Sequence, residues 1–386
     1  MPAIFTTARG GKESVRATAA ICTEFGAPLT LTGICVAEPA SGEVLVEIAA
    51  CAICHSDIMF INGGWGGALP AVYGHEASGI VREVGSQVKS VVPGDHVVVT
   101  LIRACGACPD CRDGHPVRCH KGQTADTNAV PLTLPDGTVV TQGMATGAFA
   151  ELVLIHDSQI CKIPQDFPLD LASLLACGVV TGLGAVFNTA RVRAGSHVAV
   201  IGAGGVGLNS VQGAALAGAR TVTAFDICDE KLVQAKNFGA THAISAVADD
   251  ISGQVQDITG GHGFDYVFVT VGAKAVMDAA FDHLAFGGTV VIVGMPASGV
   301  MSEYDPGLFA YKSQRILGSR MGGALISRDI PLLIELYRQG RLKLDELITG
   351  RFQFDQINRA IAASKAGDAL RNVILFPGFS QKDRGK

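Results

Sequence analysis

The chain has 386 residues, a formal net charge of −5 and no basic block, so it lacks the electrostatic footprint of a nucleic-acid-binding protein. Its length and its 48% hydrophobic residues predict a globular protein of two domains, and no run of about 18 apolar residues indicates a membrane span. The N-terminal stretch has no apolar core typical of a secretory signal, and eleven cysteines without such a signal predict a reducing, cytoplasmic location.

The first part of the chain, up to about residue 178, has the pattern of strands and loops. Short apolar or alternating runs lie at 42–51, 79–85, 94–102 and 150–155, and each is bounded by Gly, Pro or Asp. This pattern predicts an antiparallel, barrel-like domain.

A compact loop in this domain carries four cysteines, Cys105, Cys108, Cys111 and Cys119, in the spacing C-x2-C-x2-C-x7-C. Four thiolates can form a closed tetrahedral zinc site, which is structural because no coordination position is left for a substrate. Three cysteines at two-residue gaps also suit an iron–sulfur cluster, so the residues alone leave both metals open.

A second, dispersed set of candidate ligands is Cys54, His75 and Cys177. Two sulfurs and one imidazole leave the fourth zinc position open, which is the catalytic arrangement. Other interpretations remain open at this point. Cys51 and Cys54 could form a redox Cys-x-x-Cys pair, and His75 and Cys177 could simply be buried core residues.

From about residue 180 onward, strand patterns alternate with helix patterns. Predicted strands lie at 197–204, 221–227, 264–272, 287–295 and 315–319, with predicted helices at 206–219, 229–240, 327–342 and 354–367, and a closing strand at 372–376. Strand–helix alternation predicts right-handed βαβ units and a doubly wound parallel sheet.

The first of these strands runs into a G-x-G-x-x-G fingerprint made by Gly202, Gly204 and Gly207. Such glycines permit a tight turn, close approach to a pyrophosphate and close helix–strand packing. Asp226 ends the next strand and is expected to bind the ribose hydroxyls, favouring NAD over NADP because a carboxylate repels a 2′-phosphate. Lys231 could reach the same region, and a ligand-free glycine turn is the alternative.

Taken in order, these motifs resemble the zinc-dependent medium-chain alcohol dehydrogenases, and within them the aryl- and primary-alcohol branch. The motifs are CHSD at 54–57, GHEASGIVREVG at 74–85, GDHVV at 94–98, the four-cysteine loop, ACGVVTG at 176–182 and GAGGVG at 202–207. The resemblance implies a GroES-like catalytic domain made of residues 1–178 and 324–386, and a Rossmann NAD-binding domain at 179–323. It also implies two zinc ions per chain, one catalytic and one structural, and an active site in the cleft between the domains.

The resemblance assigns roles residue by residue. It makes Cys54, His75 and Cys177 the catalytic zinc ligands, Asp57 the partner that orients His75, Glu76 a carboxylate behind the metal, and Ser56 the group that hydrogen-bonds the alcohol oxygen and takes its proton. Towards the cofactor it assigns His55 and Arg371 to the pyrophosphate, Thr181 and Val206 to the nicotinamide, and the backbone at Gly205 to the phosphate turn.

Three residues of the expected substrate pocket indicate which alcohol this chain would accept. Met59 stands where many members carry a histidine that relays the proton, so we expect water to complete that route. Trp65 stands where glutathione-dependent formaldehyde dehydrogenases carry an acidic residue, and Leu101 is expected to line the same pocket. These residues favour an aromatic or extended apolar primary alcohol over a thiol conjugate, although Trp65 could instead be a loop anchor.

Two further alternatives are a formaldehyde dehydrogenase acting on a glutathione-type conjugate and a non-catalytic relative that binds NAD and zinc. The second predicts a broken ligand set, whereas all three catalytic ligands and Ser56 are present. The long segment 121–144 resembles the dimeric branch, so we expect a homodimer joined through edge strands of the Rossmann sheets, with a homotetramer as the alternative.

Overall fold

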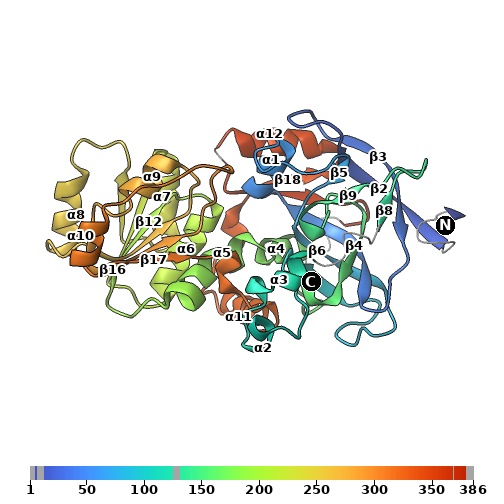
Figure 1. The fold of residues 1–386 in the computed structure, drawn as a ribbon, viewed down its shortest axis with the longest axis horizontal. Helices are drawn as coiled ribbons and strands as arrows, with labels where there is room; N and C mark the ends of the chain where they lie inside the picture. The colour runs from blue at the N-terminus through green and yellow to red at the C-terminus, as the bar shows by residue number, and fades with distance from the viewer. Residues whose placement is uncertain (1–4, 7–12, 125–130, 368, 380–386) are drawn as a thin grey trace. The chain divides into compact units, whose positions relative to one another are not determined.

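The computed structural model describes residues 5–6, 13–124, 131–367 and 369–379, which form two compact units (Figure 1). The first unit holds the residues up to Cys177 together with Leu325–Leu332 and the chain from Leu344 onward, and the second holds Gly178–Ala324 and Leu333–Lys343. The prediction from the sequence placed all of residues 324–386 in the first domain. In the structure, Leu333–Lys343 instead belongs to the second unit, so the division falls within α11 (Ile326–Arg338).

The first unit contains two antiparallel-rich sheets that share one hydrophobic core. One has the strand order β8-β3-β2-β5-β9, with β1 also paired to β2. Its strands are β1 (Phe5–Thr6), β2 (Glu13–Cys22), β3 (Thr30–Ala37), β5 (Ala71–Val72), β8 (Leu132–Thr133) and β9 (Thr141–Gln142).

The second sheet of this unit has the order β11-β7-β6-β4-β19-β18, with β10 also paired to β4. Its strands are β4 (Glu43–Ala52), β6 (Glu76–Val84), β7 (His96–Val99), β10 (Leu152–His156), β11 (Ile160–Lys162), β18 (Ile348–Gln353) and β19 (Arg371–Leu375). The predicted closing strand is β19, which pairs antiparallel with β4, Val373 lying opposite Ala52. The last strand of the chain therefore returns to the first unit.

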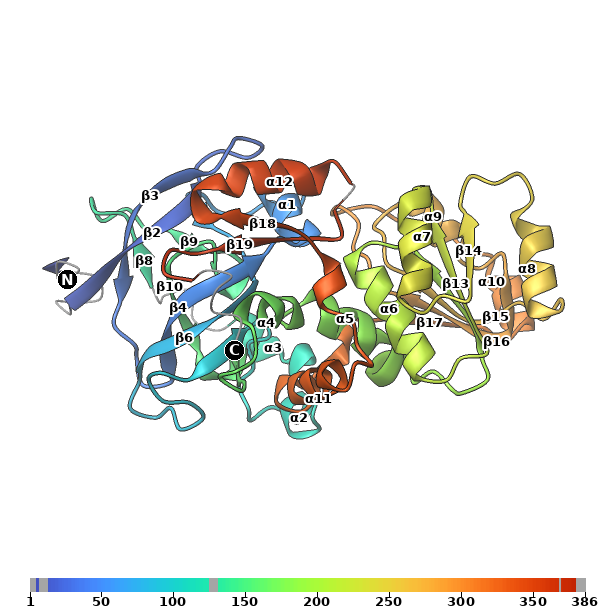
Figure 2. The same cartoon turned by 180° about the vertical axis from the view of Figure 1, so that it is seen from behind.

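Short helices connect these strands, as Figure 2 shows from behind. They are α1 (His55–Ile61), α2 (Pro109–Arg112), α3 (His120–Thr124), α4 (Leu169–Leu175) and α12 (Ile357–Lys365). Every residue of α4 from Asp170 to Leu175 is buried, and this helix packs against β4 and β6. The helix therefore covers the strands whose ends carry the predicted ligands.

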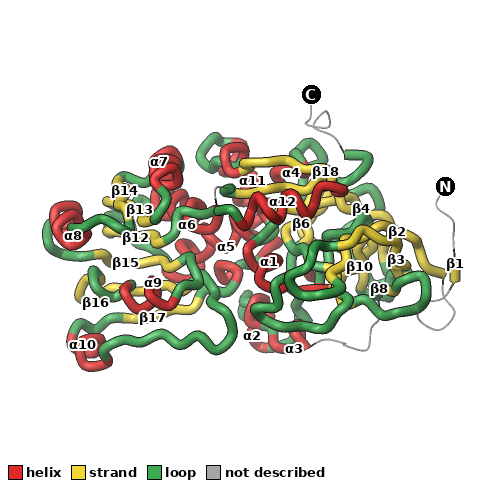
Figure 3. Tube along the Cα trace, turned by 90° about the horizontal axis from the view of Figure 1, so that it is seen from above, coloured by secondary structure: helices red, strands yellow, loops and turns green. Residues whose placement is uncertain are grey.

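The second unit is built on a six-stranded parallel sheet in the order β14-β13-β12-β15-β16-β17, which can be followed in Figure 3. The strands are β12 (His197–Ile201), β13 (Thr221–Asp226), β14 (His242–Ser245), β15 (Phe264–Val269), β16 (Leu284–Ile292) and β17 (Arg315–Gly318). The helices between them are α6 (Gly205–Leu216), α7 (Asp229–Asn237), α8 (Ile251–Thr259), α9 (Lys274–Ala279) and α10 (Pro306–Tyr311), and α5 (Gly178–Gly184) precedes the sheet.

The first strand of this sheet, β12, lies in its interior between β13 and β15. Because the chain proceeds outward in both directions from this strand, the turn after β12 lies at the topological switch point, where open α/β sheets bind ligands. Valines and alanines dominate β12 because helices cover both faces of a parallel sheet, and Val198, Ala199 and Val200 are all fully buried.

No single helix in the described part of the chain is long and apolar enough to cross a membrane. Among the described helices, the bent pair Leu169–Leu175 and Gly178–Ala190 meets the length and composition of a span when the two are taken together.

Candidate active site

Asp57 ties together the two segments that carry the first predicted ligands. Cys54 lies directly before α1, and its backbone N–H donates to Oδ2 of Asp57 at 3.1 Å. The other carboxylate oxygen accepts the backbone N–H of Gly74 at 2.9 Å and lies 2.9 Å from Nδ1 of His75. Asp57 is completely buried, so one carboxylate fixes the position of both ligand-bearing segments.

Four potential metal ligands converge next to this carboxylate. The ligand atoms of Cys54, His75, Glu76 and Cys177 all lie within 4.8 Å of one another, and all four side chains are buried. Cys54 follows the end of β4, while His75 precedes the beginning of β6, and Ala52 lies opposite Glu76 in this antiparallel pair. Helix α4 packs on the same two strands and leads directly to Cys177.

The electrostatics of the cluster favour a deprotonated sulfur. A hydrogen bond with Cys177, assisted by His75, holds the pKa of Cys54 well below its ordinary value despite burial. Burial alone would lower the pKa of His75, but the charge and hydrogen bond of Asp57 raise it well above its usual value. Burial also raises the pKa of Glu76 to about 8, against the attraction of Arg371. A thiolate is the form of cysteine that binds metals.

The donor atoms left over in this cluster fit a zinc ion. Asp57 occupies Nδ1 of His75, and the buried Nε2 has no hydrogen-bond partner among the described residues. Both carboxylate oxygens of Glu76 are also buried and have no hydrogen-bond partner among the described residues. A buried polar atom without a partner is unfavourable, and a carboxylate-oriented histidine with two cysteines is the ligand set of a catalytic zinc.

The second cysteine group also has the form of a metal site. The sulfurs of Cys105, Cys108, Cys111 and Cys119 lie within 4.8 Å of one another. The backbone N–H groups of Cys105 and Gly122 donate to Sγ of Cys119 at 3.3 and 3.2 Å. Backbone N–H groups of Ala107 and Cys108 lower the pKa of Cys105 to about 6. Four sulfurs within bonding reach of one ion fit a closed, structural zinc site.

The glycine turn of the second unit has the geometry expected of a phosphate-binding turn. Gly202 has φ of +97°, a value that side chains strongly disfavour, and a Cβ on Gly207 would overlap the carbonyl oxygen of Gly202. Gly204 is the N-cap residue of α6. The free N–H groups at this helix N-terminus favour an anion.

Asp226 lies at the end of β13, next to this turn. Its Oδ2 accepts the backbone N–H of Ala203 at 2.7 Å, and its Oδ1 accepts that of Cys228 at 3.0 Å. A carboxylate has about four acceptor positions, so capacity remains for two ribose hydroxyls. The two hydrogen bonds hold this acid in place beside the helix N-terminus.

Comparison with known proteins decides the family. The model of the alcohol dehydrogenase GroES-like domain matches residues 40–165, and that of the zinc-binding dehydrogenase matches residues 205–339. "Putative alcohol dehydrogenase D" of Mycobacterium tuberculosis is 35% identical over 94% of this chain and 100% of its own length. The chain belongs to the zinc-dependent medium-chain alcohol dehydrogenase family. The predicted fold class, the cofactors NAD and zinc, and the assignment as an NAD-dependent oxidoreductase are thereby confirmed.

Relatives with different named substrates are similarly close to this alcohol dehydrogenase. "S-(hydroxymethyl)glutathione dehydrogenase" of Paracoccus denitrificans is 33% identical over 94% of this chain and all of the relative. The crystal structure of benzyl alcohol dehydrogenase from Acinetobacter calcoaceticus has a TM-score of 0.88 at 31% identity, covering 94% and 99% of the two chains. The family is therefore determined, whereas the substrate is not.

The remaining predicted residues of the dehydrogenase lie on both units. Ser56 is half-buried, with its hydroxyl 3.6 Å from Sγ of Cys54, and His55 is exposed at the beginning of α1. Thr181, on α5, is buried and donates to Sδ of Met321 at 3.8 Å. Val206 and Lys231 are half-buried near the glycine turn and on α7. Their contacts with NAD remain predictions.

Arg371 has a partner that the sequence did not indicate. It is the first residue of β19, its side chain is 10% exposed, and its Nε lies 3.6 Å from Oε2 of Glu76. Its Nη2 has no hydrogen-bond partner in the described part of the chain. Its Nη1 donates to the carbonyl oxygen of Leu370 at 3.3 Å. The predicted pyrophosphate contact is therefore still open to Nη2.

Proposed function

We propose that the enzyme reversibly oxidises a primary alcohol with an aromatic or extended apolar substituent to the aldehyde, with NAD as the hydride acceptor. Cys54, His75 and Cys177 would hold the catalytic zinc, which supplies Lewis-acid polarisation of the substrate oxygen. The residues of the four-cysteine loop would hold the structural zinc. The buried cluster around Asp57 supports the metal assignment, and the fixed Asp226 supports NAD.

Within this proposal, the chain's own groups orient the substrate and move its proton. Ser56 presents a half-buried hydroxyl next to Cys54, where it can accept a hydrogen bond from the substrate hydroxyl and take its proton. Met59 lies one helical turn further along α1 and has no group that can pass the proton on. Solvent would therefore complete the route.

The observation that supports an apolar substrate is the aromatic cluster beside Ser56. Phe60 lies four residues after Ser56 and so on the same face of α1. The ring of Trp65 packs edge-on against Phe60 at 5.1 Å, and the ring of Tyr73 stacks on Phe60 at 5.6 Å. An anionic thiol conjugate would meet aromatic rings here, and these rings cannot form ion pairs with its carboxylates.

A panel of alcohols tests the substrate class. We expect benzyl and terpenoid alcohols to have kcat/KM values about 30- to 100-fold above that of ethanol, because burying a ring contributes about 2–3 kcal/mol. Trp65 is the single tryptophan of the chain, so its emission should also change when such an alcohol binds the zinc- and NAD-loaded enzyme. A preference for ethanol, or formaldehyde turnover that requires glutathione, would contradict the proposal.

The role of Asp226 can be tested with Asp226→Asn. Removing the charge while keeping the size should lower the ratio of kcat/KM for NAD to that for NADP by about 10- to 100-fold, since the carboxylate no longer repels the 2′-phosphate. Steady-state kinetics with both cofactors measure this ratio. An unchanged ratio would show that Asp226 does not discriminate between them.

We also propose a homodimer joined through β17. This strand pairs with β16 on one side, and no other described strand pairs with its second edge. Ile316 on β17 is 40% exposed, and Tyr311 just before it is 73% exposed. An exposed edge with apolar side chains favours pairing with another strand, as two copies of β17 could do. The predicted role of segment 121–144 falls partly on residues 125–130, outside the described ranges.

Sedimentation velocity tests this interface. We expect the wild-type protein to sediment at twice the 39.9 kDa of one chain, and Ile316→Lys to shift the distribution to monomer, because two lysines would meet across the paired edges. Val233→Lys on α7 changes an apolar residue that is more exposed, at 63%, and should leave the dimer intact. A tetramer, or a dimer unaffected by Ile316→Lys, would contradict the β17 interface.

A further inference from the structure

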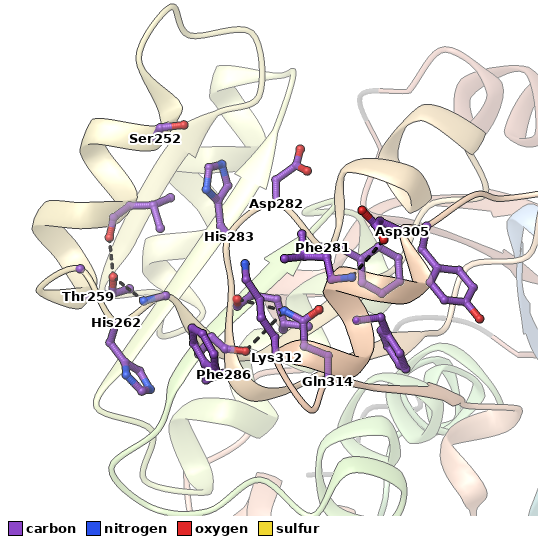
Figure 4. A pocket seen from close by; sticks show the side chains of 18 of the residues that line it. Ser252, Thr259, His262, Phe281, Asp282, His283, Phe286, Asp305, Lys312 and Gln314 are labelled. Carbon is purple, nitrogen blue, oxygen red and sulfur yellow. Dashed lines mark hydrogen bonds between the residues drawn. The ribbon is translucent and has the colours of Figure 1, made fainter.

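The second unit contains a groove that the predicted chemistry does not use. It lies between α8, α10 and the beginning of β16, and has a volume of about 670 Å³ (Figure 4). We call it the α8–α10 groove. Leu284 begins β16 and is paired with Phe264 at the beginning of β15, whereas the glycine turn follows the end of β12. Because the strands are parallel, the groove lies at the opposite end of the sheet from the nucleotide turn. Its volume is within the range of small-molecule sites.

One side of the α8–α10 groove is aromatic. Phe281, Tyr304 and Phe309 form a three-ring cluster, with centroids 5.2 to 6.3 Å apart in tilted and edge-on arrangements. Val255 of α8 and Leu308 of α10 add aliphatic surface. Rings arranged in this way offer faces and edges to a further aromatic ring, the geometry that aromatic pairs prefer.

Gln314 places an unpartnered polar atom in this groove. Its side chain is 7% exposed, and its amide nitrogen donates to the carbonyl oxygens of Leu284 and Ala285 at 3.2 and 3.5 Å. The amide oxygen therefore points away from these carbonyls, and it has no partner among the described residues. An amide oxygen without a protein partner in the lining of a groove can accept a hydrogen bond from a ligand.

Lys312 supplies a positive charge to the lining of the α8–α10 groove. Its ammonium has no ion pair within the described ranges, and its side chain is half-buried in the lining of the groove. Of the acidic residues in the lining, Asp278 pairs with Lys274, and Asp305 accepts backbone N–H groups at the beginning of α10. In Figure 4 the carboxylate of Asp282 points away from Lys312 and Gln314. The ammonium is therefore left for an anionic group on a ligand.

We propose that the α8–α10 groove binds a small aromatic carboxylate that also carries a hydroxyl or amino group. The ring would pack against Phe281, Tyr304 and Phe309, the carboxylate would pair with Lys312, and the hydroxyl or amino group would donate to the amide oxygen of Gln314. This site is independent of the alcohol-oxidation chemistry and does not rest on the proposed substrate.

Isothermal titration calorimetry of the zinc-loaded, NAD-saturated enzyme tests the site. The probes are 2-, 3- and 4-hydroxybenzoate, with benzoate and 4-hydroxybenzamide as analogues that lack one polar group. We expect one hydroxybenzoate isomer to bind once per chain, and each analogue to bind about tenfold or more weakly. Lys312→Met should weaken hydroxybenzoate binding by a similar factor, while Lys236→Met on the exposed side of α7 should not.

Gln314→Met gives the sharper result, because it should abolish the advantage of hydroxybenzoate over benzoate rather than all binding. Thermal unfolding and sedimentation of both variants check that fold and oligomeric state are retained. No binding of any probe, as when a second copy or another segment covers the groove, would overturn the proposal. Hydroxybenzoate binding that is unchanged in both Lys312→Met and Gln314→Met would also overturn it. Loss of binding in Cys177→Ser would do the same, because it would place the ligand at the catalytic cluster.

Discussion

Replacing Cys177 with serine is expected to leave a folded enzyme that retains one zinc ion per chain instead of two and has lost most of its activity. The Cys177 sulfur lies within 4.8 Å of the other donors of the buried cluster. A serine hydroxyl stays protonated near neutral pH and is a poor zinc ligand beside a thiolate and an imidazole. Losing the Lewis acid should lower kcat by about 10³-fold, equivalent to about 4 kcal/mol.

Metal analysis and steady-state kinetics of the same preparation measure both effects. The matched control is Cys51→Ala, because Cys51 is also fully buried and lies three residues from Cys54, yet it is not among the grouped donors. That variant should keep two zinc ions and most of its turnover. Two zinc ions in Cys177→Ser, or a lost zinc in Cys51→Ala, would show that the ligand set is wrongly assigned and that the Cys-x-x-Cys pair acts together.

The second unit could be predicted from local sequence because its function depends on neighbouring residues. The turn at Gly202, the start of α6 and the acid at Asp226 lie within 25 residues, and each follows from strand–turn–helix chemistry. The catalytic cluster is different. Cys54 and Cys177 are 123 positions apart, and they meet because β4 and β6 pair and α4 packs on both. Spacing alone cannot predict that convergence, so the ligand set followed from the family resemblance.

Other features carried no local signal at all. Gln314 and Arg371 look like ordinary polar residues at the edges of strands. Only the fold shows that the amide of Gln314 donates to the carbonyl of Leu284 and that Arg371 lies 3.6 Å from Glu76. The division of α11 between the units was also missed, because an amphipathic helix pattern shows that one face is buried but not by which partner.

Asp57→Asn is the substitution we expect to weaken the catalytic metal site most without touching a ligand. An asparagine has only one acceptor oxygen, while Asp57 accepts from Gly74, His75 and Cys54 through both of its oxygens. If the amide oxygen of the asparagine keeps the contacts with Gly74 and His75, its NH₂ group faces the backbone N–H of Cys54. Two hydrogen-bond donors then point at each other. In a completely buried position this conflict should cost about 1–3 kcal/mol of unfolding free energy.

The zinc affinity of the same variant should fall by about 10- to 100-fold, because a neutral amide no longer fixes the tautomer of His75 or strengthens its Nε2 as a donor. Chelator competition measures this loss, and urea unfolding measures the stability. Asp170→Asn separates the two effects: Asp170 is a buried carboxylate of the same unit that pairs with Arg351 at 2.8 Å, away from the grouped donors. It should lower stability and leave zinc affinity unchanged. If Asp57→Asn binds zinc as tightly as the wild type, Asp57 only stabilises the fold, and the orientation of His75 must come from its burial alone.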